Sequence, residues 1–189
     1  GRPCLMYIAD NDEFGVPWRM CFTKATNASA TSWSLPITIS ANGGNEIHHP
    51  AVTSIVKRPR IAYFNPGSES VTYNATPNLD GFDWMGAIDL PLGAESSRGY
   101  FPSLANVAGF PALAYYDAGE QAIRYIASDD PEGDTGWEGN GFVAGAGEYD
   151  TAAPYNAYIS LGATVGQPVI VYHDVANAEL VYSTYYEAP

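Results

Sequence analysis

Short apolar stretches separated by turn-forming residues run along the whole chain, and none of them has a helical period. The stretches 112–116 (Ala-Leu-Ala-Tyr-Tyr) and 169–172 (Val-Ile-Val-Tyr) are apolar at every position. A strand with one exposed face would alternate apolar and polar residues, whereas a strand buried on both faces need not. The glycines, prolines, asparagines and aspartates between the stretches favour tight turns. The pattern predicts an all-β protein whose sheets are covered on both sides.

The apolar stretches belong to an internal repeat, in which a proline is followed four residues later by a tyrosine. The motif occurs four times, at spacings of 56, 52 and 57 residues. The prolines are Pro3, Pro59, Pro111 and Pro168, and the tyrosines are Tyr7, Tyr63, Tyr115 and Tyr172. A period of this size is close to that of β-propeller blades.

Further aromatic residues keep fixed offsets within the repeat. Tyr73, Tyr125 and Tyr182 follow the proline by fourteen residues, while Phe22 stands in that place in the first repeat after a five-residue insertion. A tryptophan then follows at Trp33, Trp84 and Trp137. Each unit reads as four short strands, for example 102–107, 111–116, 122–127 and a last one after the tryptophan. We therefore expect a single, partial β-propeller of four-stranded antiparallel blades, with approximate repeat units 1–47, 48–98, 99–152 and 153–189.

The repeat leads to two specific expectations about the structure. Tyr63, Tyr73, Trp84, Tyr115, Tyr125 and Trp137 should be largely buried between blades. The first repeat begins on a second strand and the last ends after a third strand, so both terminal blades are expected to be incomplete. Further polypeptide should then complete the ring, either additional sequence or neighbouring chains, with about six to eight blades in all.

The net charge of the chain limits the kinds of molecule that it can bind. The chain carries 8 Lys+Arg against 21 Asp+Glu, for a formal net charge of −13. Phosphate backbones are bound by clustered basic residues, so a nucleic-acid partner is excluded. No apolar stretch approaches the roughly 18 residues of a membrane span, which argues against membrane insertion. The acidic surface fits an extracellular or cell-surface protein, although simple solubility also explains it.

The segment from Gly109 to Trp137 resembles the Asp-box propellers, the sialidase-like family with bacterial neuraminidase repeats. In that family a Ser-x-Asp-x-Gly-x-Thr-Trp turn joins the third and fourth strands of a blade. The residues that approximate it are Ser128, Asp130, Gly133, Thr135 and Trp137, with extra residues in the spacing. The resemblance implies a propeller that binds or cleaves glycans.

The catalytic residues that the resemblance implies are not found. Sialidases carry an Arg-Ile-Pro element, whereas Arg2-Pro3 and Arg58-Pro59 lack the intervening residue. Since a fold alone does not supply a catalytic set, we interpret the chain as a non-enzymatic extracellular binding, structural or assembly module. Its partner would be a glycan, a protein or copies of itself. The alternative is part of a sialidase-like glycan-cleaving enzyme whose catalytic residues lie partly outside this chain.

Polar side chains mark the ends of the second strands. Asp117, Asp174 and Asn65 occupy equivalent positions, and Asp10 lies one residue further on in the first repeat. Such residues cap tight turns by accepting hydrogen bonds from backbone N–H groups. The functional alternative is a ring of ligand-binding groups at one mouth of the propeller channel.

A second candidate is the acidic loop after the third strand of the third repeat. Asp129, Asp130, Glu132 and Asp134 place four carboxylates within six residues. Carboxylate oxygens are the ligands that Ca²⁺ prefers, so a calcium site is one interpretation. A solvated acidic turn is the other, because the loop does not match the EF-hand pattern.

The cysteines and histidines point to little chemistry. Aligning the first hairpin on its equivalents places Cys21 opposite Tyr7 rather than opposite Cys4, which argues against a disulfide. His48 and His49 are adjacent, and adjacent residues in a strand point to opposite faces. They are therefore a poor chelating pair.

Overall fold

The computed structural model describes residues 2–9, 19–41, 48–79, 81–84, 86–92, 98–147 and 158–184. Within these ranges every regular element is a β-strand, and no helix is long and apolar enough to cross a membrane. The strands are β1 (Cys4–Ala9), β2 (Arg19–Lys24), β3 (Ile37–Ala41), β4 (His48–Ile55), β5 (Arg58–Asn65), β6 (Ser70–Ala75), β7 (Ile88–Asp89), β8 (Arg98–Val107), β9 (Phe110–Asp117), β10 (Ala122–Ser128), β11 (Trp137–Gly145), β12 (Ile159–Thr164), β13 (Gln167–Asp174) and β14 (Glu179–Thr184).

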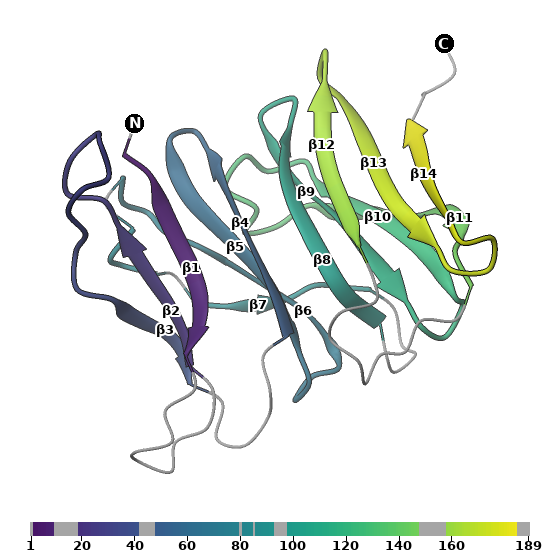
Figure 1. Cartoon of the computed structure of the whole chain (residues 1–189), viewed down its shortest axis with the longest axis horizontal. Coiled ribbons are helices and arrows are strands. Elements are labelled where there is room, and N and C mark those ends of the chain that lie inside the picture. Colours follow the sequence, from purple (N-terminus) through teal and green to yellow (C-terminus); the bar gives the residue numbers. More distant parts are fainter. Residues whose placement is uncertain are drawn as a thin grey trace.

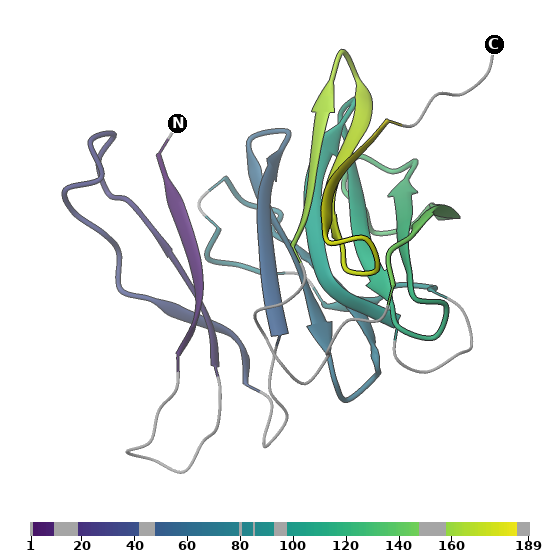
Figure 2. The same cartoon turned by 45° about the vertical axis from the view of Figure 1, so that its right-hand side comes forward.

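The strands form four antiparallel sheets that follow one another in sequence order. They are β1-β2-β3, β4-β5-β6-β7, β8-β9-β10-β11 and β12-β13-β14, and we call them blades 1 to 4. Figures 1 and 2 show the blades succeeding each other like the ribs of a fan. Among the described residues, blade 1 has no strand equivalent to β4, and blade 4 has none equivalent to β11. The predicted all-β propeller with incomplete terminal blades is confirmed.

The same two-residue turn joins the first and second strands wherever both are present. The turns are Val56-Lys57, Ala108-Gly109 and Val165-Gly166, and every one of these residues has a positive φ, between 49° and 98°. Positive φ at both central positions is the geometry of a type I′ turn, whose twist matches that of the flanking strands. The turn fixes one register in all three blades, with Ile55 opposite Arg58, Val107 opposite Phe110 and Thr164 opposite Gln167.

The hydrophobic core lies between neighbouring blades, because each sheet is covered on both faces. Tyr63, Tyr73, Tyr115 and Trp137 are buried as predicted, while Trp84 and Tyr125 are half-buried. Two equivalent edge-to-face ring contacts connect successive blades. Phe22 of blade 1 meets Trp84 of blade 2 at 5.4 Å, and Tyr73 of blade 2 meets Trp137 of blade 3 at 5.0 Å between ring centroids.

A glycine completes each of these aromatic contacts. Gly81 and Gly133 both adopt positive φ, and a Cβ on either would stand 2.7 Å from the ring of Phe22 or Tyr73 respectively. The loop before the fourth strand thus holds the third-strand aromatic of the preceding blade between a glycine and a tryptophan. This repeated contact explains why the tryptophan keeps a fixed offset in the sequence.

The cysteine register agrees with the sequence argument. Cys21 lies opposite Tyr7, while Cys4 lies opposite Lys24. Both thiols are free.

Candidate functional site

The first strands of the blades, β4, β8 and β12, lie side by side as the innermost strands of the fan (Figure 2). A pocket of about 370 Å³ opens where these three strands begin. Its lining comes from the inner strands and from the outward face of blade 4. The residues are His49, Pro50, Phe101, Pro102, Tyr158, Ile159, Ser160, Val171 and Leu180.

Three rings in this pocket occupy one register position in successive blades. His49, Phe101 and Tyr158 each stand six residues before the last residue of their inner strand, counted back from the shared hairpin turn. The rings of His49 and Phe101 meet edge to face, with centroids 4.2 Å apart. The pocket is therefore a repeated feature of the blades rather than an accident of one loop.

The backbone at two of these positions is strained in the same way. His49 and Phe101 have φ values of 55° and 53°, and the pairing of both inner strands shifts register there. Each residue precedes a proline, which normally holds the residue before it in an extended conformation. Such left-handed residues cost on the order of 1–3 kcal/mol and cluster at functional sites, and β-bulges re-aim side chains next to such sites. The recurrence of this strain in two blades favours a functional pocket.

The lining is mainly apolar and aromatic. The polar groups among the described lining residues are the His49 imidazole and the hydroxyls of Ser160 and Tyr158, and no carboxylate is present among them. A concave, aromatic surface with a few polar groups is the usual form of a small-molecule site. Hydrolysis of a glycosidic bond normally requires two carboxyl groups that flank the bond. The described lining can therefore bind a ligand but does not contain that pair.

The polar residues predicted at the ends of the second strands act as turn caps. Asn65 accepts a hydrogen bond from the Gly67 amide at 3.0 Å, and Asp117 accepts one from the Glu120 amide at 3.1 Å. Asp117 is also fully buried and lies 3.7 Å from Nε of Arg124.

Asp174 caps its turn in the same way. Its carboxylate accepts hydrogen bonds from the Asn177 amide nitrogen at 3.2 Å and from Nδ2 of Asn177 at 2.8 Å. The side-chain bond from Asn177 lowers the pKa of Asp174. None of the three residues lines the pocket, and Asp10 lies outside the described residues. Ligand binding by this set stays a prediction.

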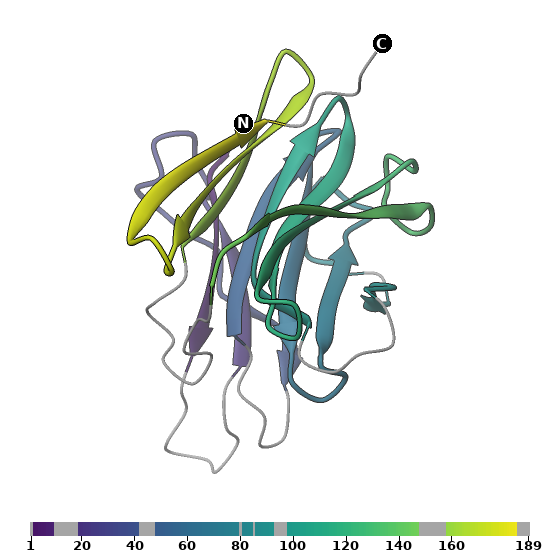
Figure 3. The ribbon, with the colours of Figure 1, turned by 90° about the vertical axis from the view of Figure 1, so that its right-hand side faces the viewer.

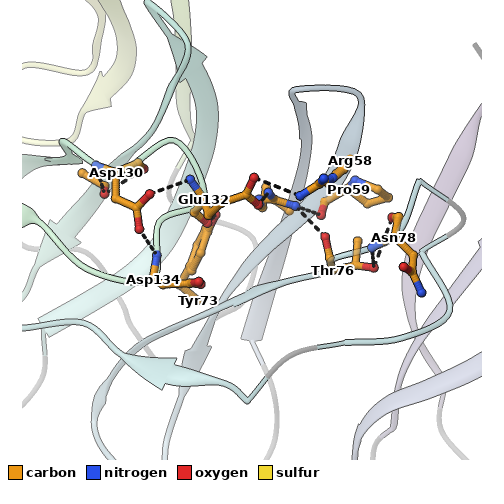
Figure 4. Close-up of polar contacts among 10 residues, drawn as sticks. Arg58, Pro59, Tyr73, Thr76, Asn78, Asp130, Glu132 and Asp134 are labelled. Carbon is orange, nitrogen blue, oxygen red and sulfur yellow. Dashed lines mark hydrogen bonds and ion pairs between the residues drawn. The ribbon is translucent and has the colours of Figure 1, made fainter.

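The acidic loop joins blade 3 to blade 2 (Figure 4). Asp130 accepts hydrogen bonds from the amides of Glu132 at 3.0 Å and Asp134 at 3.1 Å, which fixes the turn. Glu132 then pairs with Arg58 at 2.9 Å and with Arg60, whose side chain is completely buried in blade 2.

Two further bonds tie the same loop to the blades. The Tyr73 hydroxyl donates to the Glu132 carbonyl at 2.8 Å, and Nε1 of Trp137 donates to the Gly133 carbonyl at 2.7 Å. Burial raises the pKa of Tyr73, so the hydroxyl keeps its proton and remains a donor. The loop acts as a polar connection between two blades.

This arrangement differs from a cation cage. Glu132 is engaged by two arginines and Asp130 by backbone amides. The part of the chain that the structure describes contains no group of three or more His, Cys, Asp or Glu side chains able to hold a metal ion. Calcium binding by Asp129, Asp130, Glu132 and Asp134 remains a prediction for experiment.

The pocket residues were missed by sequence reasoning. The signal that was available is the aromatic-proline step at the start of the inner strands, seen in His49-Pro50 and Phe101-Pro102. Strand patterning alone gives no reason to single out this step. As an adjacent pair, His48 and His49 predict little chemistry, whereas the structure places the His49 ring against Phe101.

Fold and pocket together define a β-propeller with an aromatic-lined site at the start of its inner strands. No family model and no curated protein matches the sequence. The structure, in contrast, resembles solved glycoside hydrolases of family 43, which are five-bladed β-propellers.

Three of these structures show the extent of the likeness. A family-43 enzyme from Xanthomonas citri shares 12% identity at a TM-score of 0.54, and the match covers 98% of this chain and 66% of that one. A β-xylosidase/α-arabinofuranosidase from a compost metagenome shares 13% at 0.55, covering 100% and 68%. An exo-β-1,3-galactanase from Phanerochaete chrysosporium shares 10% at 0.56, covering 93% and 43%. The chain thus spans only part of each of these proteins, and the likeness shows the fold.

These comparisons bear on the Asp-box resemblance and on blade number. The propeller class is confirmed, but the comparisons contain no support for the sialidase-like assignment. The family-43 structures have five blades, whereas the sequence led us to expect six to eight for this protein, and its own blade number stays a prediction. Blade number depends on the angle between neighbouring blades, which the repeat pattern within a blade does not encode.

Proposed function

We propose that this chain forms most of a carbohydrate-binding propeller, whose glycan site is the pocket at the start of β4, β8 and β12. The observation that carries the proposal is the set of three rings, His49, Phe101 and Tyr158, at one register position of adjacent inner strands. Aromatic faces bury the apolar face of a ligand, as a sugar ring presents, while His49 and Ser160 can bond its hydroxyls. The similarity to propellers named as glycoside hydrolases supports a carbohydrate ligand.

Glycan cleavage is the second candidate, and the same similarity favours it over a purely structural module. The carboxylate pair that hydrolysis needs would then come from residues outside the described pocket lining. Either activity fits the extracellular or cell-surface location that we propose for this acidic chain.

Titration calorimetry with short oligosaccharides tests binding. Xylotriose and β-1,3-galactotriose are suitable first ligands, because solved complexes of similar propellers contain them. We expect Tyr158→Ala to weaken binding at least tenfold, which corresponds to the ~1.4 kcal/mol of one lost stacking contact. Tyr158 is 67% exposed, so its truncation leaves the fold intact. Leu35→Ala is the control, since Leu35 is 87% exposed and does not line the pocket.

Two outcomes would contradict the proposal. One is the absence of binding for any member of a broad oligosaccharide panel at millimolar concentration. The other is a Tyr158→Ala variant that binds as the unmodified protein does. Release of a chromophore from nitrophenyl xylosides, arabinofuranosides or galactosides, or from a fluorogenic sialoside, would establish cleavage as well as binding.

A further inference from the structure

The outward face of blade 4 is apolar and exposed. Leu180 and Tyr182 of β14 are 73% and 64% exposed, and they belong to the face directed away from blade 3. Figure 3, which views the molecule from this end of the fan, shows this sheet (yellow-green and yellow) on the side facing the viewer. An exposed apolar surface of this kind marks an interaction site.

Equivalent residues of the other blades identify what the face is built to contact. The shared register places Leu180 in the position of Met20, Val71 and Ile123, all of which are 0% exposed. Tyr182 takes the position of Phe22 and Tyr73, which are 0% and 1% exposed, and of Tyr125, which is half-buried. In blades 1 to 3 the next blade along the chain covers these positions.

At the opposite edge of the fan, the outward face of blade 1 also lacks a covering blade among the described residues. Leu5 of blade 1 is 51% exposed, whereas its equivalents Ile61, Leu113 and Ile170 are 0%, 0% and 3% exposed beneath the preceding blade. Trp33 is 41% exposed, whereas its equivalent Trp137 is 8% exposed against Tyr73. Blade 1 thus presents a tryptophan that has no aromatic partner from a preceding blade among the described residues.

We propose that these two faces are the two sides of one docking site, and that its occupant is one further blade of the same repeat, carried by the same protein. Its Pro-x-x-x-Tyr strand would pack on Leu180 and Tyr182, and the glycine and tryptophan before its fourth strand would enclose Tyr182. Its own third-strand aromatic would pack on Trp33. The inference continues an interface that the molecule already repeats three times, and it does not rest on the proposed glycan binding.

The number of strands supports one added blade rather than several. The fourteen described strands are 70% of the twenty in a ring of five four-stranded blades. The chain spans 66% and 68% of two five-bladed structures that it resembles. One blade, together with a first strand for blade 1 and a fourth strand for blade 4, accounts for the remainder.

Docking would also change the pocket. Val171 and Leu180 belong to the outward face of blade 4 and line the pocket as well. An added blade would cover these two side chains and close the pocket on that side. His49, Phe101 and Tyr158 would remain at the channel.

Hydroxyl-radical footprinting of the intact native protein tests the inference directly, with mass measured by light scattering in parallel. We expect the oxidation rate of Tyr182 to be at least tenfold lower in the native protein than in the unfolded one. Leu35, 87% exposed, should be equally reactive in both and serves as the internal control. A monomeric mass that exceeds 20.2 kDa by at least one repeat should accompany this protection.

Two outcomes would overturn the proposal. If Tyr182 reacts freely in the native protein, nothing covers the face. If its protection appears only as the mass doubles with concentration, the occupant is a second copy. A charge variant gives an independent measurement, because Tyr182→Asp should lower Tm by several degrees if the face is covered, whereas Leu35→Asp should not. Equal Tm values for these two variants would also refute a covered face. None of these outcomes depends on whether a sugar binds.

Discussion

Removal of the Glu132 carboxylate should weaken the connection between blades 2 and 3 far more than its position on a surface loop indicates. In Glu132→Ala, the Arg60 guanidinium, which is completely buried in the unmodified protein, loses its carboxylate partner and keeps the carbonyls of Pro59 and Thr76 as acceptors, at 3.1 and 3.0 Å. Loss of one member of a fully buried ion pair costs about 3–5 kcal/mol. Glu132 is 35% exposed, and water can enter its place. We therefore expect a loss of about 2–3 kcal/mol in the free energy of unfolding.

Two variants separate this effect from general damage to the loop. Arg58→Gln removes the outer partner of Glu132, whose side chain is 34% exposed, and should cost only about 0–1 kcal/mol. Asp134→Asn changes an exposed carboxylate, while the hydrogen bond in which Asp134 takes part comes from its backbone amide, so stability should hold. Urea unfolding followed by tyrosine and tryptophan fluorescence gives all three values. The argument fails if Glu132→Ala lies within about 0.5 kcal/mol of the unmodified protein, the usual range for surface changes, or if Arg58→Gln costs as much.

Three further predictions follow from local geometry. Gly133→Ala should destabilise the protein by about 2–4 kcal/mol in urea unfolding, because its φ is positive and its new Cβ would stand 2.7 Å from the Tyr73 ring. Gly109→Ala also has a positive φ but open space around it, so it should cost about 1 kcal/mol. Equal costs for the two variants would contradict the packing argument. The pKa of Asp174 is lowered in the folded state, so its contribution to stability is present above the unfolded pKa near 3.8 and is lost as the pH falls through the folded value. When Tm is measured as the pH is lowered, it should therefore fall less in Asp174→Asn than in the unmodified protein. Parallel curves of Tm against pH would refute this. Iodoacetamide should add twice to the denatured, unreduced protein, once each at Cys4 and Cys21, and a mass without adducts would reveal a disulfide.

The sequence predicted those parts of the fold that depend on offsets within one repeat. The fixed spacing from Pro59 to Tyr63 and Tyr73 reflects strand pairing and burial, both of which are set within a blade. The same reasoning placed Cys21 opposite Tyr7, although an insertion separates their strands. Local periodicity is sufficient here because each hairpin fixes its own register.

The candidate site was not predictable in this way, because it depends on contacts between blades and on unusual backbone angles. Arg60 and Glu132 are 72 residues apart, and nothing in either repeat marks them as partners. His49 and Phe101 take a left-handed conformation before proline, where a sequence pattern indicates extended backbone. Asn65, Asp117 and Asp174 were recognised as recurring, and their recurrence is explained by turn capping.

The type I′ turns at 56–57, 108–109 and 165–166 have a consequence for how this scaffold can diversify. They lie at the far ends of the inner strands, about 20 Å from the pocket residues at a rise of ~3.3 Å per residue. Val56 and Lys57 take the left-handed geometry although neither is glycine or asparagine, so the two-residue turn holds the register without requiring one particular sequence. One rim of the propeller thereby carries the strained aromatic residues of the candidate pocket, and the opposite rim carries turns whose sequence can change at constant length without disturbing that pocket.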